Sequence, residues 1–299
     1  MPASPTAAPI RPRRSVLYMP GSNARAIEKA RTLAVDGVIL DLEDAVAPDA
    51  KAAARAQVAE AVKAGGFGGR EVVIRINGLD TPWGEADLRA AAAAGPDAVL
   101  APKISSPSQI VRLASLLASA GAPSSLRLWA MVETPLAILN AGAIASAAQD
   151  PSNRLACFVM GTNDLAKETR ARFTPDRAPF GQWLSTAVTA ARAYGLDILD
   201  GVYNAISDEA GFRAECKQGR DFGFDGKTLI HPSQIEPANA IFAPSADEVA
   251  WSRKIIAAFQ EPENRDKGAL QLDGKMVERM HAEIGRRVVA IADAIAARG

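Results

Sequence analysis

Cysteine, histidine and aromatic residues are scarce in this 299-residue chain, and each scarcity narrows the class of protein. The two cysteines, Cys157 and Cys216, are too few for a disulfide framework, which favours a reducing cytoplasm. The two histidines, His231 and His281, and the absence of a Cys/His cluster disfavour a zinc site. Aromatic residues make up 5% of the chain while alanine is abundant, which fits alanine-rich helices packed on aliphatic strands.

Charge and hydrophobicity exclude two further classes. Lys+Arg and Asp+Glu number 34 each, so the formal net charge gives no electrostatic case for binding nucleic acid or an anionic membrane. No apolar segment approaches the roughly 20 residues needed to span a bilayer. The opening MPASPTAAPIRPRR has prolines where a signal peptide carries its apolar core, and we expect residues 1–12 to form a disordered tail.

Eight short apolar segments alternate with helical patterns along the chain. This alternation predicts βαβ units and a parallel sheet, and eight units in about 230 residues match an α/β fold, the (β/α)₈ TIM barrel. An open doubly wound sheet is the alternative. The eight segments are SVLYM (15–19), GVILDLED (37–44), EVVIRIN (71–77), AVLAPK (98–103), RLWAMVE (127–133), LACFVMG (155–161), LDILDG (196–201) and KTLIHP (227–232).

We place the barrel at residues 13–243 and a C-terminal helical extension at residues 244–299. The extension would serve as an extra layer, a lid or an oligomer arm. The extension reads as a helix over 244–262, a polar, glycine-containing connection over 263–276, and a terminal helix.

Polar residues end nearly every predicted strand. In a barrel the active site is built from the carboxyl ends of the strands and the loops that follow them. The joint position of these residues therefore predicts one chemical site at one mouth. They are Tyr18, Glu43, Asp44, Arg75, Lys103, Glu133, Asp164, Asp200 and His231.

Glu133 and Asp164 follow consecutive predicted strands, so their carboxylates are expected to reach a single ion. Two carboxylates with open water positions suit Mg²⁺, which prefers oxygen ligands and keeps several waters. The alternative is that each carboxylate simply caps the helix that follows it.

Arg75 lies at the end of the core strand in VIRINGLDTPWG (73–84), where a guanidinium needs an anion. Arginine can hold a substrate carboxylate bidentately beside the metal. The alternative is an ion pair with Asp41, Glu43 or Asp44 on the neighbouring strand. Glu43 and Asp44 would then support Arg75 or the waters of the metal.

The segment PGSNARAIEK (20–29) places backbone amides and two cations, Arg25 and Lys29, at a helix start that could hold a phosphate. By itself this is a weak motif.

Several segments, in order, resemble motifs of the HpcH/HpaI aldolase and citrate lyase β-subunit-like family, which includes malyl-CoA and citramalyl-CoA lyases and malyl-CoA thioesterases. The resemblance covers residues 13 to about 285. It rests on RSVLYMPGSNARAIEKA, VILDLEDAVAPDAK, VIRINGLDTPWG, APKI, MVETP, GTNDLA and DGKTLIHPSQI.

The resemblance implies a (β/α)₈ barrel that assembles as a homotrimer or homohexamer and uses Mg²⁺, with Mn²⁺ as a substitute. Its partners would be an acyl-CoA substrate and a small oxo-acid. By the same resemblance Glu133 and Asp164 are metal ligands, and Arg75 holds the carboxylate or oxo-acid. The substrate-binding residues would be Tyr18, Arg25, Lys29, Asn163, Asp164, Ile230 and His231. Tyr18, Lys29, Ile230 and His231 would line the CoA path.

Two positions depart from the family pattern. The family often has an arginine where this chain has Asn23, and Arg25 is the candidate replacement for its phosphate contact. Family lyases often carry DGKMID, whose aspartate enters a neighbouring subunit as acid/base; here the segment is DGKMVERM and Glu278 takes that place. The alternative for Glu278 is a surface glutamate that complements the dipole of the following helix.

The first hypothesis for function is therefore a Mg²⁺-dependent CoA-ester lyase acting on malyl-CoA, citramalyl-CoA or a close relative, with Arg75 and Glu278 as catalytic residues. The second is a (3S)-malyl-CoA thioesterase, with Glu278 activating water. The third is a citrate lyase β-subunit acting on an acyl-carrier thioester. A non-catalytic binding module is disfavoured by the crowding of polar residues at one mouth.

Overall fold

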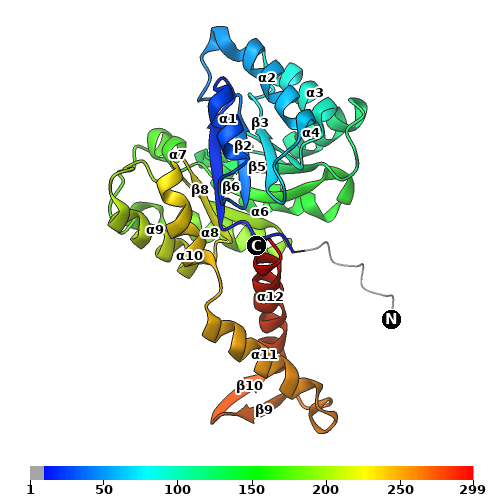
Figure 1. Cartoon of the computed structure of the whole chain (residues 1–299), viewed down its shortest axis with the longest axis vertical. Helices are drawn as coiled ribbons and strands as arrows, with labels where there is room; N and C mark the ends of the chain where they lie inside the picture. The colour runs from blue at the N-terminus through cyan, green and yellow to red at the C-terminus, as the bar shows by residue number, and fades with distance from the viewer. Residues whose placement is uncertain (1–9, 299) are drawn as a thin grey trace. The chain divides into compact units, whose positions relative to one another are not determined.

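The computed structural model describes residues 10–298, which fall into two compact units (Figure 1). Residues 13–242 form the barrel unit, and residues 243–298 together with 10–12 form the C-terminal unit. Most of the predicted tail, residues 1–9, lies outside the described residues. No helix within 10–298 is both long and apolar enough to cross a membrane.

The barrel unit contains eight parallel strands that close in sequence order, with β1 pairing both β2 and β8. The predicted (β/α)₈ barrel is thereby confirmed, and the open sheet is excluded. Most of the predicted segments ran past the strand ends, because the polar residues that follow lie in loops. The strands are β1 (Ser15–Pro20), β2 (Gly37–Asp41), β3 (Glu71–Arg75), β4 (Ala98–Ala101), β5 (Arg127–Val132), β6 (Leu155–Met160), β7 (Asp197–Asp200) and β8 (Gly226–Leu229).

Ten α-helices of the described barrel unit connect these strands and cover the barrel (Figure 1). Their buried residues are largely alanine, leucine and isoleucine, as the composition predicted. The helices are α1 (Ala24–Ala30), α2 (Lys51–Ala64), α3 (Gly84–Ala94), α4 (Pro107–Ser119), α5 (Pro135–Leu139), α6 (Ala141–Ser146), α7 (Thr162–Thr169), α8 (Gly181–Ala193), α9 (Glu209–Phe222) and α10 (Ile235–Phe242).

Strand alternation divides the apolar side chains between two cores. Outward-facing residues such as Val38 and Leu40 of β2 pack in the large core that includes the helices, whereas Ile39 belongs to a separate cluster. That cluster fills the barrel interior and consists of Val16, Ile39, Val73, Ala98, Leu100, Trp129, Met131, Cys157, Val159 and Leu199. The barrel is therefore a packed core, and its chemistry is confined to the ends.

The amino end of the barrel interior is closed by Arg13. Its guanidinium donates to both Glu71 carboxylate oxygens, at 2.6 and 2.7 Å, and contacts Asp197. It also lies over the Trp129 ring, 5.0 Å from the centroid. Since the guanidinium is paired on two sides, this end is structural.

Asp200 corrects one part of the sequence analysis. It ends β7 beside the inward-facing Leu199, so its side chain points out of the barrel. There it accepts hydrogen bonds from Lys227 at 2.9 Å and Arg177 at 2.8 Å, and Glu215 of α9 joins the network. Burial alone would raise the pKa of Asp200, but the two cations outweigh it and hold the pKa below its usual value. Asp200 therefore stabilises the barrel wall and does not belong to the mouth.

The C-terminal unit holds α11 (Ala246–Gln260), β9 (Ala269–Leu272), β10 (Lys275–Glu278) and α12 (Arg279–Ala296). The two strands pair antiparallel, so the polar connection predicted over 263–276 contains most of a β-hairpin, which the sequence analysis did not predict. Asp273 and Gly274 join them with φ of 49° and 75°, the positive values that a tight type I′ hairpin needs. Val277 and Ala282 pack with Ile255 and Phe259 of α11 to form the core of this unit.

The buried network gives a prediction about stability. Asp200→Ala leaves Lys227 without its buried carboxylate partner on β7, and we expect a loss of about 3–5 kcal/mol in the free energy of unfolding. Urea denaturation of the metal-free protein measures it. Asp221→Ala removes an exposed aspartate from α9 and should leave the midpoint unchanged. A loss below about 1 kcal/mol for Asp200→Ala would place the network among surface-like ion pairs.

Candidate active site

One layer of polar side chains closes the carboxyl end of the barrel interior. Tyr18, Asp41, Arg75 and Glu133 continue the inward-facing positions of their strands, because each follows an interior residue by two. Asp41 and Arg75 are also direct neighbours in the β2–β3 pairing. Strand alternation thus brings a carboxylate, a guanidinium and a second carboxylate to the end of one apolar core.

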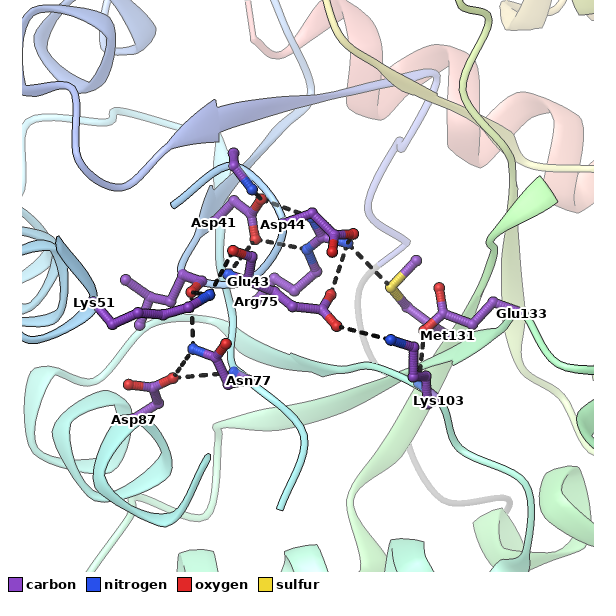
Figure 2. Close-up of polar contacts among 12 residues, drawn as sticks. Asp41, Glu43, Asp44, Lys51, Arg75, Asn77, Asp87, Lys103, Met131 and Glu133 are labelled. Atoms are coloured by element: carbon purple, nitrogen blue, oxygen red, sulfur yellow. Dashed lines mark hydrogen bonds and ion pairs between the residues drawn. The ribbon is translucent and has the colours of Figure 1, made fainter. Parts of the chain in front are cut away.

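Arg75 is buried and makes an extended set of contacts (Figure 2). Its Nε and Nη2 donate to the two oxygens of Asp41, each at 2.6 Å, so the bidentate fork is directed at this aspartate. Nη1 contacts Glu43 at 2.9 Å and Asp44 at 3.3 Å. The ring of Tyr18 packs against the guanidinium carbon at 4.9 Å. The ion pair considered from the sequence is therefore present, and Nη1 is the nitrogen left beside the more exposed acids.

Asp41 is the residue of this layer whose role the sequence analysis underestimated. Besides the two guanidinium bonds, its oxygens accept backbone N–H groups from Glu43 at 2.8 Å and Ala45 at 3.0 Å. Those bonds turn the chain after β2 and return Glu43 toward Arg75. Burial raises the pKa of Glu43 to about 7, although the Arg75 guanidinium opposes the shift.

Three buried residues that the sequence analysis did not single out support the loop after β2 through hydrogen bonds. Lys51 donates to the carbonyls of Leu42 and Glu43 at 2.9 and 2.7 Å. Asn77 donates to the Leu42 carbonyl at 2.8 Å and to Asp87 at 2.6 Å (Figure 2). A lysine and an aspartate in helical segments are ordinarily surface residues, so only the fold reveals this role.

Glu133 is almost fully buried at the end of β5, with 1% of its surface exposed. Its Oε1 accepts the backbone N–H of Lys103 at 2.6 Å. Burial raises its pKa to about 8, the nearby Glu43 adds to the shift, and the Lys103 N–H opposes it. A buried carboxyl of this kind becomes an anion readily only when a cation is supplied.

Asp164 lies in the first turn of α7, directly after β6 and Gly161. Among residues 10–298, no arginine, lysine or histidine forms an ion pair with Asp164 or Glu133, and no cluster of three or more His, Cys, Asp or Glu has the arrangement of a metal site. Two carboxylates without a cationic partner fit Mg²⁺, which is commonly held by one or two carboxylates and several waters. They do not fit a zinc cage of three or four protein ligands.

The remaining substrate-binding candidates lie around the mouth in different settings. Asn163 is exposed and shares two side-chain hydrogen bonds with Asn204 of the β7–α9 loop, at 2.8 and 3.3 Å. Arg25 and Lys29 are exposed on α1, whose N-terminal cap is the Asn23 side chain. Tyr18 is half-buried under Arg75.

Ile230 and His231 follow β8 directly and are both exposed. The Nδ1 of His231 accepts the Ser233 N–H at 3.2 Å and lies 2.8 Å from the Ser233 hydroxyl, so the ring caps the turn that follows. Their roles along a CoA path stay predictions.

Glu278 belongs to the C-terminal unit, where it is the N-terminal cap of α12. Its side chain accepts the backbone N–H of His281, and its own N–H donates to His281 Nδ1 at 2.9 Å. This reciprocal capping is a structural role close to the alternative considered from the sequence. The catalytic role of Glu278 stays a prediction.

Comparison with known proteins identifies the family of the chain. Residues 14–232 match the sequence profile of the HpcH/HpaI aldolase/citrate lyase family. A (3S)-malyl-CoA thioesterase from Cereibacter sphaeroides is 52% identical over 286 residues, covering 96% of each chain. A citrate lyase subunit beta from Leuconostoc mesenteroides subsp. cremoris is 34% identical and covers 94% of each chain.

Among solved structures, protein CitE from Mycobacterium tuberculosis in complex with magnesium, acetoacetate and coenzyme A superposes with a TM-score of 0.75. It is 30% identical and covers 95% of this chain and 100% of its own. The profile match spans most of the barrel unit and the relatives span nearly the whole chain. This chain therefore belongs to the HpcH/HpaI aldolase/citrate lyase family.

Proposed function

We propose that the protein is a Mg²⁺-dependent enzyme that hydrolyses the thioester of a hydroxyacyl-CoA such as (3S)-malyl-CoA. The observation that carries the proposal is the pair Glu133 and Asp164, two carboxylates at one barrel mouth without a cationic partner in the described chain. The thioesterase relative, 52% identical over nearly the full length of both chains, supports hydrolysis over the lyase reaction that the sequence analysis ranked first.

Glu133 and Asp164 would hold the ion, with Mn²⁺ as a substitute. The bound ion would polarise the substrate carbonyl and stabilise the negative charge that develops on its oxygen. Nη1 of Arg75 would bind the hydroxy-acid end of the substrate. Asn163 would contact the same end, while Tyr18, Arg25, Lys29, Ile230 and His231 would line the CoA path.

Glu278 is the proposed general base. Its carboxylate would take a proton from water as the water oxygen bonds to the thioester carbonyl carbon. The carbon–sulfur bond would then break, and the CoA sulfur would accept that proton from Glu278 and leave as the free thiol. The products are free hydroxydicarboxylate and CoA.

Carbon–carbon cleavage is the second candidate, since the citrate lyase β-subunits are also full-length relatives. In that reaction a base removes the 3-hydroxyl proton, the C–C bond breaks, and the acyl-CoA enolate accepts a proton from Glu278. A citrate lyase subunit would use an acyl-carrier thioester in place of CoA.

We further propose that the enzyme is a cytoplasmic homotrimer or homohexamer in which Glu278 serves a neighbouring barrel. Cys157 and Cys216 are both buried and not disulfide-bonded, which suits a reducing compartment. Met276 of β10 is 70% exposed, and Met280 and Ile284, one turn apart on α12, are 54% and 57% exposed. Exposed apolar side chains of this size support a subunit contact.

Product analysis tests the reaction. Purified protein with Mg²⁺ and (3S)-malyl-CoA should release malate and free CoA, whereas glyoxylate and acetyl-CoA would support the lyase.

Substitution of the two carboxylates tests the metal site. Glu133→Gln and Asp164→Asn should each lower turnover by at least about 100-fold, because the ion would lose a ligand. Glu168→Gln removes an exposed carboxylate from the same helix as Asp164 and should be as active as wild type. Full activity and Mg²⁺ binding in both site variants would contradict the metal assignment.

The raised pKa of Glu133 predicts a pH dependence. A carboxyl whose folded-state pKa is raised, here from 4.5 to about 8, stabilises the fold at low pH and loses that contribution as pH rises through about 8. The metal-free protein should therefore become less stable between pH 6 and pH 9, and Mg²⁺ should restore stability at pH 9. Urea midpoints at both pH values measure this.

Glu133→Gln is the control for the pH dependence. Its decline in stability should be shallower but not absent, because the pKa of Glu43 is also raised, to about 7. An equal decline in wild type and variant would mean that Glu133 does not titrate in this range.

Subunit mixing tests Glu278. Glu278→Gln should fold and bind Mg²⁺ but turn over about 10²–10⁴-fold more slowly, as expected for loss of a general acid or base. Mixing it with Glu133→Gln subunits should recover partial activity, because some sites then combine an intact barrel with an intact Glu278. Normal turnover by Glu278→Gln alone would remove the residue from the mechanism. A dead mixture of freely exchanging subunits would mean that each Glu278 serves its own barrel.

A further inference from the structure

Lys103 has an unusual backbone for its place in the fold. It follows β4 and Pro102 with a φ of 51°, in the left-handed region that lysine rarely adopts. Five non-glycine residues of the described chain have positive φ, and the other four lie in turns or at helix and 3₁₀-helix ends. They are Arg154, Arg170, Arg177 and Asp273.

The left-handed backbone directs the Lys103 N–H at a site carboxylate. The Lys103 backbone nitrogen lies 2.6 Å from Oε1 of Glu133 and donates a hydrogen bond to it (Figure 2). Glu133 follows the neighbouring strand β5. On the other side of Glu133, a β-carbon at position 161 would lie 2.5 Å from Oε2, so only glycine fits there. The carboxylate is therefore fixed between one donated N–H and one bare backbone position.

The surrounding contacts maintain this conformation. The Ser105 hydroxyl lies 2.8 Å from the Thr134 hydroxyl, and Asn140 donates to the Ser105 carbonyl at 2.8 Å. The first contact ties the loop after β4 to the start of α5, and the second ties it to the junction between α5 and α6. Unfavourable backbone conformations persist where the surroundings determine them, and they concentrate at functional sites.

The Lys103 side chain lies apart from this backbone contact. It is 52% exposed, and its ammonium lies 3.8 Å from Glu43, so it contributes positive charge at the mouth and leaves Oε1 of Glu133 to the main chain. The two parts of the residue can therefore be tested separately.

We propose that Lys103 is a positioning residue whose left-handed main chain aims the Glu133 carboxylate at the metal. This inference rests on the proposed metal site. The group that orients Glu133 is thus a backbone N–H of the β4–α4 loop and not a side chain. Groups that orient a metal ligand typically contribute about 10–100-fold in metal affinity or activity.

A series of neutral substitutions isolates the main chain. All four variants lack the ammonium: Lys103→Gly, Lys103→Asn, Lys103→Met and Lys103→Val. Tolerance of a left-handed backbone decreases in that order, and valine strongly disfavours it. We expect Lys103→Gly to bind Mg²⁺ within about threefold of Lys103→Met and Lys103→Val to bind it about 10–100-fold more weakly. Isothermal titration calorimetry of all variants at the same pH measures the affinities.

Arg170 provides the matched control. It is exposed at the end of α7 with a φ of 61°, so Arg170→Gly and Arg170→Val apply the same backbone change outside the site. Arg170→Gly and Arg170→Val should differ from each other in urea midpoint and should bind Mg²⁺ with equal affinity. Equal Mg²⁺ affinities in folded Lys103→Val and Lys103→Met would overturn the proposal, as would an equal loss in Arg170→Val.

Hydrogen exchange separates this inference from the metal assignment. In the metal-free protein the Lys103 amide should exchange at least about tenfold faster in Glu133→Ala than in wild type, because its acceptor is gone. If wild type binds no Mg²⁺ but this acceleration occurs, the metal proposal fails and the contact stands. Unchanged exchange shows that the N–H does not hold Glu133, and the positioning role is then rejected whatever Mg²⁺ does.

Discussion

The buried pair of Asp41 and Arg75 is the interaction on which the rest of the mouth depends. A guanidinium at the end of an apolar barrel is tolerable only when its donors are matched, and Asp41 matches two of them at 2.6 Å. The same carboxylate binds the backbone N–H groups of Glu43 and Ala45. One aspartate thus neutralises the arginine, turns the chain after β2 and delivers Glu43 to the remaining guanidinium nitrogen.

This arrangement divides the charge of the mouth into two parts. Around Arg75 the carboxylates share a cationic partner, since Asp41, Glu43 and Asp44 all contact its guanidinium. Glu133 has no ion-pair partner in the described chain, and burial raises the pKa of its carboxyl to about 8. The divalent cation proposed at Glu133 and Asp164 would supply the missing positive charge.

Much of this was predictable from sequence, and the failures have physical causes. Eight apolar segments ending in polar residues suffice for a barrel with one chemical mouth. The placement of Asp200 at the mouth was wrong because a polar residue at a strand end can face into or out of the barrel. A shift of one residue along the strand reverses the direction of the side chain. The β9–β10 hairpin was missed although Asp273-Gly274 is a strong turn signal, because short, largely exposed strands have little apolar patterning. The pairing of Asp41 with Arg75 and of Lys103 with Glu133 joins residues far apart in the chain. Lys51 bonds to nearby backbone carbonyls, which no side-chain pattern reveals.

The choice between hydrolysis and carbon–carbon cleavage depends on a group outside the ligand pair. Both reactions need the same polarised carbonyl, so the barrel carboxylates alone do not select between them. Selection falls to the acid or base, and the candidate Glu278 is engaged as the cap of α12 through His281. Capping interactions contribute about 1 kcal/mol, and a rotation that frees the carboxylate is therefore inexpensive compared with the barrier it would help to lower. Structural capping and catalysis by Glu278 are thus compatible, and its longer side chain, in place of the aspartate of the family motif, is the feature of this chain best placed to favour water over the C–C bond.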